Sequence, residues 1–302
     1  MDSIYKKQNE PVLLSCIAAQ RKEYSRAKKG DFYKDLITVI FALFSIVASW
    51  VDNEMLTAIV FLFAIATSLS SKYLDTHTHM HQKIAALIQQ YVDVTLYSGI
   101  LKNDISNWGR IPTRSLIAET LATFKSSDVD QVKNWYSDYS KFSPIEQVFY
   151  CQKENLRWDI NLRKEFKKIL LVLGLLIMAL IVAAVLVINP SVIRFLCAAS
   201  WMLPLIDFLC FYWNRLQKDI ERLKRLEGKC EQIDRSISKK DFSKLESESE
   251  KVQQIKGDII DLQKEILEHR KESAFIPNWF YKVRQKNYQE KEDRIADEMK
   301  KL

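Results

Sequence analysis

The sequence predicts an all-α membrane protein in which four transmembrane helices form two hairpins and extensions of these helices build a cytoplasmic domain. Two observations indicate this fold class. The apolar residues of the 302-residue chain are gathered in blocks, whereas a soluble globular protein distributes them at helix or strand period. The blocks come in two pairs about a hundred residues apart, and each pair flanks a short polar turn. The low glycine content, six residues, argues against a large sheet and against glycine-rich phosphate loops.

This pattern divides the chain into five expected regions. They are a cytoplasmic N-terminal helix (1–34), a first transmembrane hairpin (35–71), a cytoplasmic middle domain (72–168), a second transmembrane hairpin (169–213) and a cytoplasmic C-terminal helical hairpin (214–302).

The first hairpin joins apolar segments at 36–51 and 55–69 through the acidic turn at 52–54. Each segment has about 15 residues, and with its apolar flanks it approaches the length needed to cross a hydrocarbon core of roughly 30 Å. The alternative is a buried hairpin of a soluble protein. Adjacency, a near absence of charge and charged flanks favour the membrane.

The second hairpin gives the stronger membrane signal. The segment 169–188 has about twenty residues without a charge, which suffices for a span at 1.5 Å rise per residue. An Asn-Pro pair at 189–190 ends this helix, and the chain returns through 192–213. Two charges interrupt the returning segment, Arg194 near its start and Asp207 deeper in.

Asp207 is the acid that lies deepest in an apolar segment, and an ionisable residue there is costly unless it faces a bundle interior or water. It is therefore a candidate pore-lining or gating residue. An interfacial acid paired with Arg215 or with a nearby Trp or Tyr group is an equal alternative. Pro204, one turn before Asp207, is expected to kink the helix.

Basic residues flank the outer ends of both hairpins, whereas the first turn has no base and the second has one nearby arginine. Positive charge collects on the cytoplasmic side of a membrane, so we expect both termini and the middle domain to be cytoplasmic. The flanking bases are Lys28, Lys29, Lys34, Lys72, Arg163, Lys164, Lys167, Lys168, Arg215, Lys218, Arg222 and Lys224.

The cytoplasmic sequence continues the membrane helices. A capping box at 143–146, with proline at the first helical position, begins a helix of about 45 residues that reaches the end of the third span. The segment 72–97 extends the second span with one apolar face. Apolar residues also repeat at 3–4 spacing in 220–237 and 252–266. These two stretches predict an antiparallel hairpin or coiled coil, or helices that cover the cytoplasmic core.

Aromatic residues beside arginines mark the candidate ligand site, because such pairs suit nucleobase stacking together with phosphate binding. The alternative is a packed core with membrane-proximal arginines, since buried Trp and Tyr usually shape the fold. The candidates are Arg110, Arg114, Trp135, Tyr136, Arg157 and Trp158.

Neither a metal site nor a catalytic site is expected. Of His77, His79 and His81, only the first and last share a helix face, and no cysteine or acid lies at ligand spacing. The five cysteines show no pairing framework and are expected to be reduced thiols. No nucleophile–base arrangement is suggested, so the protein is not expected to be an enzyme or to need a cofactor.

Several short stretches, in order along the chain, resemble the SMODS-associated four-transmembrane effector family. They are Gln8-Asn9-Glu10, Ala18-Ala19-Gln20-Arg21, Tyr24-Ser25, Asn134-Trp135-Tyr136-Ser137-Asp138, the stretch 151–159, Leu162-Arg163 and Ile276-Pro277-Asn278-Trp279-Phe280.

The resemblance implies a pore-forming effector of anti-phage signalling in the bacterial inner membrane. A cyclic di- or trinucleotide made after infection would bind the cytoplasmic domain and trigger permeabilisation, which kills the cell. Four helices are too few for a wide pore, so a homo-oligomer in contact with membrane lipid is expected, and DNA is not an expected partner. The alternatives are a scaffolding membrane protein that recruits a partner and a constitutive ion channel or transporter.

Overall fold

The computed structural model describes residues 3–48, 51, 53–123, 132–188, 191–238 and 250–301, and within these ranges it contains helices and no strand. The predicted all-α class is therefore confirmed for the described residues. The helices are α1 (Ile4–Lys7), α2 (Pro11–Ala48), α3 (Glu54–Leu101), the short 3-10 helix η1 (Ile105–Trp108), α4 (Arg114–Ala122), α5 (Pro144–Ile188), α6 (Val192–Ser238), α7 (Glu250–Glu272) and α8 (Asn278–Met299).

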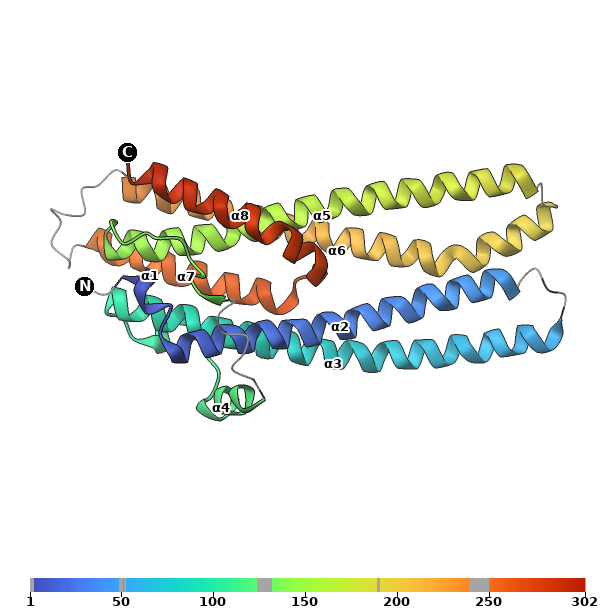
Figure 1. Ribbon diagram of the computed structural model, residues 1–302, viewed down its shortest axis with the longest axis horizontal. Coiled ribbons are helices and arrows are strands. Elements are labelled where there is room, and N and C mark those ends of the chain that lie inside the picture. Colours follow the sequence, from blue (N-terminus) through green and yellow to red (C-terminus); the bar gives the residue numbers. More distant parts are fainter. Residues whose placement is uncertain are drawn as a thin grey trace.

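The molecule is elongated, and four long helices, α2, α3, α5 and α6, run along it (Figure 1). Both termini, α7 and α8 lie at one end, which we call the head. The other end, which we call the stem (36–69 and 169–211), contains the apolar parts of the four long helices. There α2 pairs with α3 and α5 pairs with α6, so the stem has the two predicted hairpins (Figure 1).

Two helices, α3 and α5, are long and apolar enough to cross a membrane. In their most apolar windows 6% and 0% of the residues are buried, which leaves these surfaces open to lipid. The expected spans of α2 and α6 include positions outside the described residues, among them the side chains of Arg194 and Pro204. A membrane domain with four crossings thus stays a prediction, whereas two helices of spanning character are observed.

The predicted capping box begins α5 as expected. The Ser143 amide donates to Glu146 Oε2 at 2.8 Å, and the Glu146 amide reaches Ser143 Oγ at 3.5 Å. From this cap one helix of 45 residues crosses from head to stem. At 1.5 Å per residue it is roughly 65 Å long, a rigid connection between the two ends of the molecule.

The head has a continuous hydrophobic core. The predicted apolar repeats of α6 and α7 are buried in it, with Leu223 and Ile259 fully inaccessible to solvent. These helices run in opposite directions (Figure 1) and pack on α3 and α5. Both interpretations of the repeats therefore describe one arrangement, an antiparallel pair that also covers the core. Trp108, Tyr97, Tyr136 and Phe149 are the largest fully buried side chains.

A second cluster of buried side chains joins the head to the stem. Phe166 of α5, Tyr212 of α6 and Phe280 of α8 pack together there, with the Phe166 and Phe280 ring centroids 5.3 Å apart. In the other hairpin, a Cβ on Gly30 of α2 would collide with the Thr78 hydroxyl of α3. Glycine at this position therefore lets α2 and α3 approach closely where they leave the head.

Candidate ligand-binding site

A cavity of about 950 Å³ lies in the head between α2, α5 and α8, with α3 and α7 contributing to its walls. This volume is at the upper end of the range for small-molecule and cofactor sites. Apart from Gln8-Asn9-Glu10, each short stretch that resembles the four-transmembrane effector family contributes residues to this cavity, although these stretches are scattered from residue 18 to residue 278 of the chain.

The cavity is basic. Eight lysine and arginine side chains line it against five aspartates and glutamates. The bases come from four helices and the loop before α5, and they are Arg21, Lys22, Lys28, Lys133, Arg163, Arg270, Lys282 and Lys300. An excess of positive charge in a recessed site raises the local concentration of anions, so the cavity fits an anionic ligand.

Aromatic rings alternate with these charges. Trp158 of α5 packs against Tyr281 and Tyr288 of α8, with ring centroids 5.3 and 5.2 Å apart. Trp135 and Tyr24 also face the cavity. Planar groups of a ligand can stack on such rings, as bases do in proteins that bind single-stranded nucleic acid.

Some of the basic residues belong to buried ion pairs that hold the helices together. Arg270 NH1 of α7 lies 2.6 Å from Asp93 Oδ2 of α3. Arg163 of α5 contacts Asp159 at 2.9 Å and Asp219 of α6 at 2.8 Å. Burial alone would raise the pKa of Asp159, but Arg163 and His269 hold that pKa well below its usual range. These carboxylates neutralise the two arginines, whose first role is structural.

Lys28 is different. Among the described residues no carboxylate lies within ion-pair distance of its amine, which sits 5.5 Å from the centre of the Tyr281 ring. Burial, together with the nearby guanidinium groups of Arg163 and Arg21, lowers the pKa of Lys28 to about 8. The cavity therefore contains a basic side chain that forms no ion pair with any carboxylate of the described residues.

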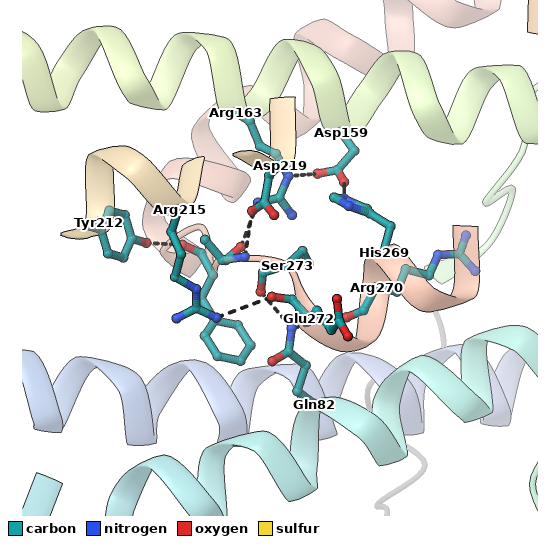
Figure 2. Close-up of polar contacts among 12 residues, drawn as sticks. Gln82, Asp159, Arg163, Tyr212, Arg215, Asp219, His269, Arg270, Glu272 and Ser273 are labelled. Carbon is teal, nitrogen blue, oxygen red and sulfur yellow. Dashed lines mark hydrogen bonds and ion pairs between the residues drawn. The ribbon is translucent and has the colours of Figure 1, made fainter. Parts of the chain in front are cut away.

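The linker between α7 and α8 connects the cavity wall to the long helices (Figure 2). Gln82 of α3 donates to the Arg270 carbonyl at 3.1 Å and to the Ser273 carbonyl at 2.8 Å. Arg163 of α5 donates to the Ala274 carbonyl at 2.8 Å.

Two side chains of α6 complete this set. Asp219 accepts from the Ala274 amide at 2.7 Å, and the Tyr212 hydroxyl donates to the Phe275 carbonyl. Three helices that enter the stem thus bind one short segment of backbone, the linker 273–277 that leads into α8. The start of α8 is therefore joined to α3, α5 and α6 by hydrogen bonds.

The six predicted ligand residues do not all line the cavity. Trp135, Tyr136 and Trp158 line the cavity. Arg157 forms a bidentate ion pair with Glu292 of α8, in which Nε donates to Oε1 at 2.9 Å and Nη2 donates to Oε2 at 2.5 Å. Arg110 and Arg114 lie around η1 and α4 and do not line the cavity.

Tyr136 has a second role in the core. Its hydroxyl donates to Asp93 Oδ1 at 2.6 Å and accepts from the Asn155 amide at 2.8 Å, and its side chain is 1% exposed. Although Tyr136 lines the cavity, its side chain is therefore fixed in the core of the head.

Asp207, the predicted gating residue, is exposed on α6 in the stem. Arg215, its alternative partner, reaches the carbonyl of Glu272 at 3.4 Å. The histidines of α3 also find partners that spacing did not reveal. His81 Nδ1 lies 2.5 Å from Glu23 of α2, and its Nε2 lies 3.3 Å from His77 Nε2. Within the described residues no group of three or more such side chains could hold a metal ion.

Sequence reasoning missed the cavity residues of α2 and α8, above all Arg21, Lys28 and Tyr281. The signal for α2 was present, because Arg21, Tyr24 and Lys28 recur at spacings of three and four on one helix face. Their distance in sequence from the aromatic stretches at 135 and 158 concealed it.

Within the described residues, fold and site together define a helical protein that has two helices long and apolar enough to cross a membrane and a basic cavity with aromatic rings in its head. The chain belongs to the family described as the SMODS-associating 4TM effector domain, whose model matches residues 2–299. The resemblance stated from the short stretches is thereby confirmed.

A relative supports the same assignment. The chain is 28% identical over 207 residues to a protein of Bacillus cereus (strain VD146) that is described as a probable CBASS effector molecule. The match covers 68% of this chain and 65% of the relative, so the chain spans just under two thirds of that protein's length. No solved structure matches the chain.

Proposed function

We propose that this protein is a CBASS effector of anti-phage defence that a cyclic nucleotide activates to permeabilise the bacterial inner membrane. Family membership and the description of the Bacillus cereus relative support the class. The observation that carries the proposal is the cavity, because it combines an excess of lysine and arginine side chains with aromatic rings, and because most of the stretches that resemble the family line it. A cyclic di- or trinucleotide has complementary groups, phosphodiester anions and planar bases.

The membrane part of the proposal has four crossings, with both termini and the head in the cytoplasm. The two spanning helices, α3 and α5, each pair with a helix that carries a further apolar segment (Figure 1). The basic residues concentrate at the head side of all four segments, as the positive-inside rule requires for a cytoplasmic head.

Activation follows from differential binding. A ligand shifts the balance between resting and open states only by as much as it prefers the open one, and a change from 1:99 to 99:1 needs about 10⁴-fold preference. The α7–α8 linker supplies a route for this preference, because it joins the cavity wall to α3, α5 and α6. A pore wide enough to kill the cell would then form from several copies of the stem, with each copy in contact with lipid.

Dye release from liposomes tests this function. Purified protein is reconstituted into vesicles loaded with a self-quenching dye, and a panel of cyclic di- and trinucleotides is added. We expect release with one or a few members of the panel and no release without nucleotide. Release that does not depend on nucleotide would indicate a constitutive channel, and absence of release with the whole panel would contradict the proposal. Recovery of a stable protein partner in that second case would favour the scaffolding alternative.

A further inference from the structure

We propose that Lys28 is the phosphate-binding residue of the cavity, where its ammonium, presented from α2 beside the Tyr281 ring of α8, binds a phosphodiester oxygen of the ligand. The identity of the ligand rests on the proposed function. The anion site itself follows from the geometry and can be tested separately.

The site lies at the seam between α2 and α8, which long polar contacts join. Asn278 at the start of α8 donates to Ser25 Oγ of α2 at 3.2 Å. About two turns further along α8, Gln285 accepts from Arg21 at 3.4 Å. Between these two contacts the Tyr281 ring lies under both cations of α2, 5.5 Å from Lys28 Nζ and 6.0 Å from Arg21 Cζ.

The electrostatics of the seam favour an anion. Lys28 lies close enough to Arg163 and Arg21 for both to repel its charge, and the acid that acts on it, Asp159, is engaged by Arg163 and His269. A cation in these surroundings is destabilised by burial and by like charge, and an anion between Lys28 and Arg21 removes both penalties at once. A phosphate oxygen accepts strong charge-assisted hydrogen bonds from both side chains.

The aromatic neighbours of Lys28 restrict which chemical group of the ligand can adjoin the bound phosphate. Tyr281 packs on Trp158 with ring centroids 5.3 Å apart, and both rings line the cavity beside the seam. A ligand whose phosphate binds Lys28 therefore places its adjoining group against an aromatic wall. This fits a nucleotide better than inorganic phosphate, and it assigns charge recognition to Lys28 and base discrimination to other cavity residues.

A pair of neighbouring lysines tests the site. Lys28→Gln removes the partly buried charge, whereas Lys29→Gln makes the same change on an exposed side chain one residue away. With a cyclic nucleotide that the wild type binds, we expect K28Q to weaken binding about 10- to 100-fold, the effect of one hydrogen bond to a charged group. K29Q should bind as the wild type does, and Lys28→Arg should retain most of the affinity. Equal affinity of K28Q and the wild type would overturn the proposal.

Thermal unfolding of K28Q excludes loss of fold as the cause. Lys28 makes no ion pair among the described residues, so K28Q should melt at or slightly above the wild-type temperature. The slope of log affinity against log salt should also fall in K28Q, which a purely structural role would leave unchanged.

A chemical probe tests the anion site without any cyclic nucleotide. Pyridoxal 5′-phosphate carries an aldehyde and a phosphate. Its aldehyde condenses with a lysine amine to an imine with loss of water, and borohydride reduction fixes the product for mass spectrometry. In the detergent-solubilised full chain, Lys28 should be labelled faster than Lys29, and inorganic pyrophosphate should protect it. The proposed anion site would be rejected if Lys28 were labelled more slowly than Lys29, or if pyrophosphate did not change the labelling of Lys28. Protected labelling in a protein that binds no cyclic nucleotide would retain the site and reject the proposed messenger.

Discussion

The head and the stem use opposite means to hold their helices. In the head, buried carboxylates and arginines from different helices pair at defined positions, as Asp93 of α3 does with Arg270 of α7. In the stem, large apolar side chains such as Leu176 and Leu186 of α5 are 55% and 76% exposed. Contacts within the chain therefore cover the core of the head, whereas the exposed apolar surface of the stem is left for lipid or other helices to cover.

The largest effect on the free energy of unfolding is expected from a substitution that removes one partner of a buried ion pair in the head. Arg270→Met leaves the Asp93 carboxylate, which is 1% exposed, without its charged partner. The cost should be about 3–5 kcal/mol of the free energy of unfolding, measured by chemical denaturation in detergent. Arg294→Met, on the exposed face of α8, is the control. A loss below about 1 kcal/mol in R270M would show that the head does not depend on this pair.

Truncation of one leucine in each region compares them directly. Leu223 of α6 is fully buried in the head, and its replacement by alanine should cost about 2–5 kcal/mol, because a cavity remains. Leu176→Ala removes a side chain that packs on little within the chain and should cost much less in the same unfolding assay. Equal losses would mean that the stem packs as tightly as the head.

The connection between the two regions should depend on the α7–α8 linker. Tyr212→Phe removes the donor to the Phe275 carbonyl and leaves that buried oxygen unpaired, which costs about 1–3 kcal/mol. Nucleotide affinity should change little, while the maximal dye release at saturating nucleotide should fall. The control is Tyr73→Phe, at an exposed tyrosine of α3. An unchanged maximum in Y212F would exclude this linker as the coupling element.

The smallest effect concerns the pH response of the head. Burial raises the pKa of Glu154 to about 8, although the Ser137 amide donates to its carboxylate. Between about pH 4.5 and pH 8 the folded state keeps the proton that the unfolded state releases, so this contribution to stability is present at low pH and is lost as pH rises through 8. Melting temperatures across this window should fall with pH in the wild type.

Glu154→Gln removes the titrating group and should flatten that dependence. Glu298→Gln, at an exposed position of α8, should keep the wild-type slope. Identical slopes in E154Q and the wild type would show that the Glu154 carboxyl is already ionised in the folded head.

By itself, the sequence determined the helical class, the two hairpins and the long helix that begins at Ser143. These features depend on local properties of the chain, namely the length of apolar blocks, their periodicity and helix capping. Residues that are close in sequence decide each of these without any tertiary contact. Trp135 and Trp158, two of the ligand residues predicted from the sequence, line the cavity, and their role in ligand binding stays a prediction.

Tertiary structure alone decided which cations face the cavity and which are neutralised. Arg157, a predicted ligand residue, pairs with Glu292 more than a hundred residues away, whereas Lys28, read from the sequence as a membrane-flanking base, is left without an acid among the described residues. Such pairings depend on which helix faces meet in space, and residue spacing within one helix carries no information about them. For the same reason the joining of α3, α5 and α6 at one short linker could not be deduced before the helices were packed together.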